Sequence, residues 1–171
     1  MSAFVALLRA VNVGGTGKLA MADLRAMAVE LGFTDVATWI ASGNLLFRSA
    51  LHEAEVKRLL EARLADYAGK AVPVFVRSGA EMAAIVAADP FPDAHPSRHL
   101  VYFRDTPPPP DTVTMARDIK EERIVLGLRE LYVDYGAGIR DTRLKLPEPT
   151  LATGRSINTV RKLAALLGAM G

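Results

Sequence analysis

Residues that could hold an anion gather in three glycine-containing segments of an otherwise apolar sequence. They are Arg9, Asn12, Lys18, Ser42, Asn44, Arg155, Asn158 and Thr159. Arginine makes bidentate contacts with phosphate oxygens, and asparagine supplies both a donor and an acceptor that can orient a ligand. We therefore expect these residues to form one anion-binding pocket, provided that the fold brings the three segments together.

The first segment, over 12–18, resembles a phosphate-binding loop but lacks the Walker pattern. That pattern needs a glycine at a fixed distance before Gly-Lys and a serine or threonine directly after it, whereas Asn12 and Leu19 stand at these places. Nucleotide hydrolysis of that kind is thereby excluded. Two interpretations stay open: Arg9, Lys18 and backbone N–H groups hold an anion, or the glycines only allow the turn from strand to helix.

The other two segments, 42–44 and 153–159, can likewise be explained either by ligand binding or by local structure. Ser42 and Asn44 enclose Gly43, which is typical of a tight hairpin as well as of a polar sheet end. Ser42 lacks the strand-elbow-helix context of a nucleophilic serine. The polar residues from Thr153 to Thr159 exceed what a helix cap needs, so capping and oxyanion binding are both open there.

Metal and thiol chemistry have little support in the sequence. There are no cysteines, which excludes disulfides, thiolate nucleophiles and cysteine zinc sites. The histidines, His52, His95 and His99, do not form the His-Glu-x-x-His pattern of a zinc site. We expect no metal and no cofactor.

Charge and hydropathy bound the class of protein. The 21 Lys and Arg residues nearly balance the 19 Asp and Glu residues, so the net charge is +2 and nucleic-acid binding is permitted but not implied. The start of the chain lacks a signal-peptide pattern, and no apolar run approaches the roughly 18 residues of a membrane span. We expect a cytoplasmic protein without a membrane partner.

The elements that must position these residues are predicted from two signals: short apolar runs, which indicate buried strands, and apolar residues at helical spacing, which indicate helices. In the first part the pattern predicts a strand over 4–8, a helix from Met21 with Gly32 beyond its end, strands over 36–40 and 45–47, a helix capped by Ser49, and a strand over 72–76. The predicted order is therefore strand-helix-strand-strand-helix-strand.

The second part nearly repeats this order. After a helix begun by the capping-box pair Ser78 and Glu81, the pattern predicts a strand over 100–103, a proline-rich spacer over 107–110 and a short helix capped by Asp111. A hairpin of strands over 123–126 and 131–135 then leads to a last helix, with no obvious final strand.

This order predicts an α+β fold of two ferredoxin-like units of the βαββαβ type, packed as one module. The expected units cover 1–78 and 79–171. One continuous mixed sheet is the alternative. The helix stripes predict a core that includes Leu24, Met27, Leu59, Leu60, Val160 and Leu163.

Three stretches together resemble a known family. They are Leu7-Leu8-Arg9-Ala10-Val11-Asn12-Val13-Gly14-Gly15, Ser42-Gly43-Asn44-Leu45-Leu46-Phe47 and Thr153-Gly154-Arg155-Ser156-Ile157-Asn158-Thr159-Val160. In this order they are similar to the bacterial domain-of-unknown-function family number sixteen-ninety-seven. The resemblance implies a two-unit α/β fold and a cytoplasmic protein, and it implies no known activity.

Three hypotheses for function follow. The first is a binding module for a phosphate-bearing small molecule or a nucleic-acid backbone. The second is an enzyme that acts on a phosphorylated substrate with the same polar and basic cluster. The third is a protein-interaction module without a ligand site, which a large exposed apolar patch would favour.

Overall fold

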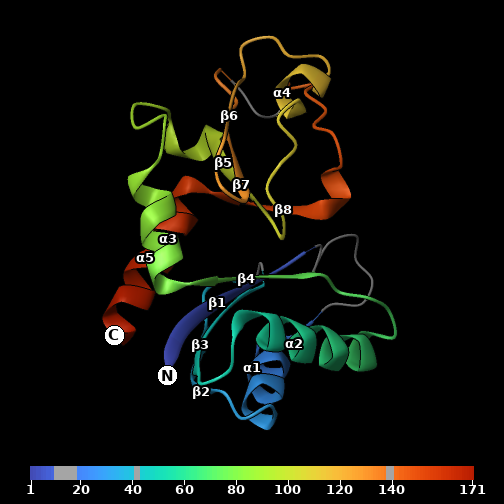
Figure 1. Cartoon of the computed structure of the whole chain (residues 1–171), viewed down its shortest axis with the longest axis vertical. Helices are drawn as coiled ribbons and strands as arrows, with labels where there is room; N and C mark the ends of the chain where they lie inside the picture. The colour runs from blue at the N-terminus through green and yellow to red at the C-terminus, as the bar shows by residue number, and fades with distance from the viewer. Residues whose placement is uncertain (10–18, 41–42, 138–140) are drawn as a thin grey trace. The chain divides into compact units, whose positions relative to one another are not determined.

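The computed structural model of the chain describes residues 1–9, 19–40, 43–137 and 141–171. The chain divides into two compact units (Figure 1). Unit 1 combines Met1–Met82 with Leu163–Gly171, and unit 2 is Ala83–Lys162. The end of the chain is thus part of the first unit.

The main part of unit 1 follows the predicted order of elements. It contains β1 (Ser2–Leu8), α1 (Met21–Glu30), β2 (Thr34–Thr38), β3 (Asn44–Ser49), α2 (Glu53–Ala68) and β4 (Val74–Ser78). The strands form an antiparallel sheet in the order β2-β3-β1-β4. Figure 1 shows α1 and α2 on the same side of this sheet.

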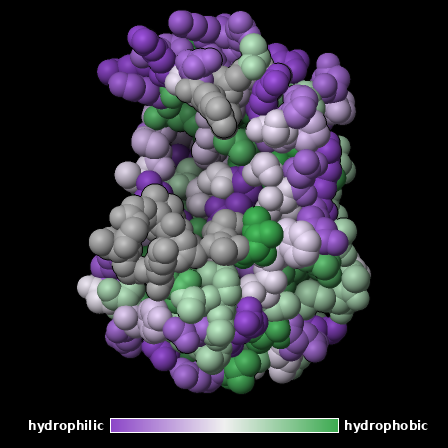
Figure 2. Space-filling model, turned by 180° about the vertical axis from the view of Figure 1, so that it is seen from behind, coloured by the Kyte–Doolittle hydropathy of each residue, from purple (hydrophilic) through white to green (hydrophobic). Residues whose placement is uncertain are grey.

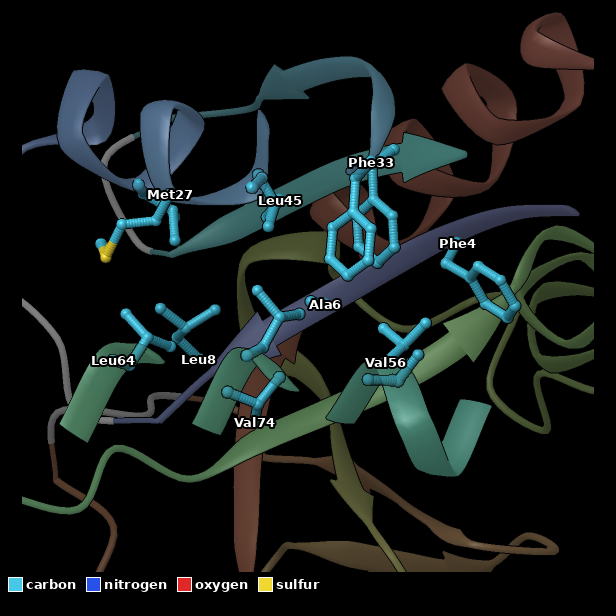
Figure 3. Close-up of a cluster of buried hydrophobic side chains, with 14 of the residues drawn as sticks. Phe4, Ala6, Leu8, Met27, Phe33, Leu45, Val56, Leu64 and Val74 are labelled. Atoms are coloured by element: carbon cyan, nitrogen blue, oxygen red, sulfur yellow. The ribbon is translucent and has the colours of Figure 1, made fainter. Parts of the chain in front are cut away.

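The core of unit 1 lies between those helices and one face of the sheet. Phe4, Ala6 and Leu8 alternate along β1 and contact the same apolar cluster as Met27 of α1 and Leu64 of α2, as Figure 3 shows. Alternation on the strand and a 3.6-residue stripe on each helix produce this layer. The cluster therefore follows directly from the pattern of the sequence.

Unit 2 contains a second antiparallel sheet in the order β6-β7-β5-β8. Its elements are β5 (His99–Arg104), the short helix α4 (Thr112–Met115), β6 (Arg123–Leu126), β7 (Glu130–Asp134) and β8 (Ala152–Ser156), with single-turn helices at Pro96–Arg98 and Pro149–Leu151. Two further helices, α3 (Gly79–Ala87) and α5 (Ile157–Met170), each contain residues of both units.

The prediction of an α+β fold with two sheets is confirmed, and the alternative of one continuous sheet is wrong. The finer prediction of two ferredoxin-like units stays a prediction, as does the boundary after residue 78. One expectation was wrong in its details: a last strand exists. Residues 152–156 form β8 where the sequence indicated only the start of a helix, because Thr153, Gly154 and Ser156 have no apolar alternation that would reveal a strand.

Most helix ends and core residues were predicted correctly. Ser78 and Glu81 form the expected capping box: the Ser78 N–H donates to the Glu81 carboxylate at 3.0 Å, and the Glu81 N–H donates to Ser78 Oγ at 3.1 Å. Ser49 does not cap α2, since it ends β3 and accepts the Leu51 N–H. Of the expected core residues Leu59 is only half-buried, and the others are buried.

No helix within the described ranges combines the length and hydropathy needed to cross a lipid bilayer. The apolar residues of β1 and β3 and the stripe residues of α1 and α2 are instead buried in the core of unit 1.

Candidate functional site

The junction between β8 and α5 carries the terminal polar segment. Strand and helix are contiguous, because Ser156 is the last residue of β8 and Ile157 the first of α5. Ser156 Oγ accepts the Thr159 N–H at 3.3 Å and donates to Thr159 Oγ1 at 3.1 Å. Ser156 and Thr159 therefore cap the helix, while Asn158 lies exposed in its first turn.

Arg155 is the most unusual residue of this junction, because its charged side chain is buried. Its Nη1 donates to Thr153 Oγ1 at 2.8 Å and to the Gly154 carbonyl at 2.9 Å, two neutral acceptors. Burial lowers the pKa of the Arg155 guanidinium to about 10. The group is still a cation at neutral pH, and part of its hydration has been lost.

Strand register decides which residues share a sheet face with Arg155. Arg155 is paired with Val101 and Thr153 with Phe103, and Val101 is paired in turn with Tyr132. Side chains on paired residues point to the same face. We call this face the polar face of unit 2; its buried polar members are His99, Glu130, Tyr132, Asp134, Thr153 and Arg155.

A buried histidine–aspartate pair lies at the edge of this face, and sequence reasoning missed it. His99 Nε2 lies 2.6 Å from Asp89 Oδ1, and Asp89 also accepts the Phe91 N–H at 2.9 Å. Arg161 of α5 approaches the other carboxylate oxygen at 3.5 Å. His99 has no exposed surface, so the pair ties the end of α3 to β5 and is not placed to touch a ligand. Nothing in the sequence indicated a partner for either residue.

Asp134 and Arg123 form a second ion pair on the polar face. Arg123 donates to Asp134 Oδ2 through Nε at 3.0 Å and through Nη2 at 2.5 Å, and its guanidinium lies 4.4 Å from the centre of the Phe91 ring. Burial opposes ionisation, but the Gly136 N–H and the Arg123 charge outweigh it and lower the pKa of Asp134. Asp134 is therefore an anion that is already neutralised within unit 2.

The opposite face of the same sheet carries a pair of tyrosines. The hydroxyls of Tyr102 and Tyr135 lie 2.6 Å apart. Burial is the main reason that the pKa of each tyrosine is raised. The Tyr102 ring lies directly over Gly154 of the neighbouring strand. Both phenols stay protonated at neutral pH, so they act as hydrogen-bonding groups rather than as nucleophiles.

Tyr135 also lines an open pocket of about 240 Å³ in unit 2. Its other lining residues are Lys120, Glu121, Glu122, Ala137, Asp141 and Thr142. Hydrogen bonding, above all from the Lys120 N–H, lowers the pKa of Glu122. The acidic lining makes this pocket a poor site for a phosphate. Among the described residues no group of His, Asp and Glu could hold a metal ion.

The predicted site residues of unit 1 have structural partners where they are described. Asn44 is buried; its Nδ2 donates to the Trp39 carbonyl at 3.0 Å, and its own carbonyl accepts the Trp39 N–H at 3.1 Å. Asn44 thus closes the hairpin between β2 and β3, while Gly43 has the positive φ of 83°. Arg9 follows β1, half-buried, with its N–H donating to the Pro73 carbonyl.

Asn12, Lys18 and Ser42 lie outside the described residues. The described candidates are divided between the units: Arg9 and Asn44 belong to unit 1, and Arg155, Asn158 and Thr159 to unit 2. The last three lie together at the β8–α5 junction. A single pocket that joins all three segments stays a prediction.

Comparison with known proteins places the chain in a family. A family model described as "Protein of unknown function (DUF1697)" matches residues 1–132. The chain belongs to this family. The match covers β1 through part of β7 and confirms the resemblance noted from the sequence. The DUF1697 match carries no assigned activity.

The DUF1697 chain is also similar to a solved structure, that of the conserved bacterial protein SP0830 from Streptococcus pneumoniae. The two share 24% sequence identity with a TM-score of 0.82, and the alignment covers 97% of this chain and 98% of the other. At this identity the likeness shows the fold alone. A search of curated proteins found no match.

Proposed function

We propose that this DUF1697 protein is a binding module for a phosphate-bearing ligand, either a small molecule or a nucleic-acid backbone, and that the β8–α5 junction is its anion-binding part. The single observation that carries the proposal is the burial of the Arg155 side chain just before the start of α5, which also lowers the pKa of its guanidinium to about 10. Because a buried cation has lost part of its hydration, an anion placed beside it lowers the electrostatic free energy of the pair. A fully hydrated arginine on the surface would contribute much less binding free energy, because it must give up water to contact the ligand.

The adjoining helix supports the same sign of charge. α5 is 14 residues long, so its N-terminus carries a partial positive charge next to Arg155. Its sequence contains Arg161 and Lys162 and no acidic residue. Asn158 is exposed in the first turn, where its amide can contact a ligand oxygen.

The proposal is tested by titrating the protein with inorganic phosphate, a nucleoside monophosphate and a short single-stranded RNA. At a ligand concentration of about 100 times Kd, binding stabilises the folded protein by about 2.7 kcal/mol and raises the melting temperature. R155Q is expected to abolish this shift, and R155K to retain part of it because lysine keeps the charge without the bidentate fork. R58Q, a substitution at an exposed arginine of α2, is the matched control.

Two results would contradict the proposal. One is an unchanged shift in R155Q. The other is the absence of any shift with all three ligands in the unaltered protein at high concentration. If only RNA binds, with an affinity that falls steeply as salt rises, the ligand is a nucleic-acid backbone rather than a metabolite.

Protein interaction is a second candidate function, favoured by one stretch of unit 2. Large apolar side chains are exposed at Val113, Met115, Ile119, Val125 and Leu128, the last with 86% of its surface accessible. On the face seen in Figure 2, however, apolar residues form small separate patches between hydrophilic ones. Sedimentation of the unaltered protein and of L128S across a range of concentrations tests this candidate: association that L128S weakens would support it.

A further inference from the structure

Arg104 is a second buried arginine of unit 2, at the end of β5, and the proposed function does not use it. It is paired with Ala152, whereas Arg155 is paired with Val101. Because side chains alternate along β8, Ala152 and Arg155 point to opposite faces of the sheet. Arg104 therefore lies on the face that carries Tyr102, away from the β8–α5 junction.

A small pocket of about 60 Å³ adjoins Arg104. It is lined mainly by apolar groups and contains one cation; the lining residues are Tyr102, Arg104, Leu131, Leu146, Pro147, Glu148, Pro149 and Ala152. Tyr102 is fixed there by the bond between its hydroxyl and that of Tyr135. Apolar walls around one guanidinium fit a ligand with a single negative charge and an apolar body.

The chain places its own carboxylate at this guanidinium, through a weak contact. Glu148 Oε2 lies 3.3 Å from Arg104 Nη2, and Arg104 Nε donates to the Thr106 carbonyl at 3.4 Å, both long for charge-assisted hydrogen bonds. The Glu148 side chain is 47% exposed. A contact of this length at the mouth of a pocket is easily exchanged for a better one.

The backbone at Glu148 is strained. Its φ of 51° lies in the left-handed region, which is unfavourable for a residue other than glycine, and Pro147 and Pro149 stand on either side. Such strain is typical of segments that change conformation when a ligand binds. Glu148 is thus a carboxylate held in an unfavourable conformation by a long ion pair.

We propose that this pocket binds a small aliphatic monocarboxylate, and that the ligand displaces Glu148 from Arg104. The ligand carboxylate accepts from the guanidinium in place of the Glu148 carboxylate. Its alkyl chain lies against Leu131 and Leu146. A phosphate dianion is disfavoured here, because the walls offer few donors beyond Arg104 for its remaining oxygens.

The test follows the side-chain Nε–H resonance of Arg104 by ¹H–¹⁵N NMR while butyrate is added. The unaltered protein is expected to show a saturable shift. E148Q removes the competing charge, so it is expected to bind butyrate up to roughly fivefold more tightly, the gain that corresponds to losing a partly exposed ion pair. E55Q, which removes an exposed carboxylate from α2, is the matched control and leaves the affinity unchanged.

R155Q separates this site from the proposed function. It is expected to keep butyrate binding even if it abolishes phosphate binding, because Arg155 lies on the other face of the sheet. The absence of a saturable shift in both the unaltered protein and E148Q would overturn the site. Equal butyrate affinity in these two would overturn the displacement of Glu148, and tighter binding of inorganic phosphate than of butyrate would overturn the ligand class.

Discussion

Gly154 shows how closely one residue can determine the packing of a strand. A Cβ added there would lie 2.7 Å from Tyr102 Cε1, far inside van der Waals contact. G154A is therefore expected to destabilise the protein by about 1–3 kcal/mol, because the ring must move and its hydroxyl bond to Tyr135 is strained. Urea unfolding measures this loss.

Gly168 is the matched control, because a Cβ at this position of α5 would meet nothing within 4 Å. In a helix interior alanine is favoured over glycine, so G168A is expected to stabilise the protein by about 0.5–1 kcal/mol. Equal effects of the two substitutions would show that the Tyr102 contact does not restrict position 154.

Tyr132 determines part of the behaviour at high pH. Burial, with smaller effects of the Glu130 and Asp89 charges, raises the pKa of Tyr132 to about 12, and its hydroxyl donates to the Ile85 carbonyl at 2.8 Å. The folded protein thus keeps a proton that the unfolded chain releases near pH 10. Stability contributed by Tyr132 is present below pH 10 and is lost as the pH rises toward about 12.

Tyr132 alone contributes a slope of about 1.4 kcal/mol per pH unit within this window. Y132F removes this contribution and leaves that of the buried pair Tyr102 and Tyr135. Y67F, at an exposed tyrosine, leaves the Tyr132 contribution in place. Denaturant midpoints measured between pH 9 and pH 12 compare the variants, and parallel curves for the unaltered protein and Y132F would contradict the assignment.

At the level of the element, α2 offers a direct test of the predicted core. Leu60 is 1% exposed within the apolar cluster of unit 1, whereas its neighbour Leu59 is half-buried. L60A is expected to cost about 2–5 kcal/mol, and L59A clearly less, because only the first leaves a closed cavity. The free energy of unfolding in urea measures both, and a smaller loss in L60A than in L59A would show that the helix is rotated.

The same contrast explains what the sequence could predict. The stripes of α1 and α2, the capping box of Ser78 and Glu81, and the short apolar runs of the strands in unit 1 are local signals, and the structure confirms the elements that they predict. β8 has no apolar run of this kind. Its residues Thr153, Gly154 and Arg155 are held in a strand by their pairing with β5. Tertiary contact, not local pattern, makes this segment a strand.

The sequence likewise reveals some residues of the candidate site and not others. Arg155 was identified because an arginine among polar residues is visible in the sequence, but its burial was not. The sequence predicts Asn44 as a ligand residue, whereas in the structure its side chain donates to the Trp39 carbonyl inside the hairpin. The pair of Asp89 and His99 could not be found, because only folding brings these residues together.

At the scale of the whole molecule, the last residues of α5 belong to unit 1. Leu163 and Leu167 are buried, and Arg48 Nη1 donates to the Met170 carbonyl at 2.6 Å. Deletion of residues 163–171 is therefore expected to destabilise unit 1 by several kcal/mol, at about 2–5 kcal/mol for each buried leucine. Fluorescence of Trp39, the single tryptophan, reports the unfolding of this unit.

Deletion of Gly171 alone is the control for that truncation, because this residue is exposed. It is expected to leave the Trp39 transition unchanged. An unaltered transition after removal of 163–171 would mean that the helix end contributes nothing to the first unit.

The return of α5 to unit 1 also has a consequence for synthesis on the ribosome. A nascent chain that has emerged up to Met82 holds β1 to β4 but lacks the end of α5 that completes the unit, which is translated only after the whole of unit 2. Domains generally fold in the order in which they emerge, at about 5–20 residues per second. Here the first unit must wait about 4–18 seconds, the time needed to translate the residues from 83 to 171. Its exposed apolar surface during that interval is a natural substrate for a chaperone.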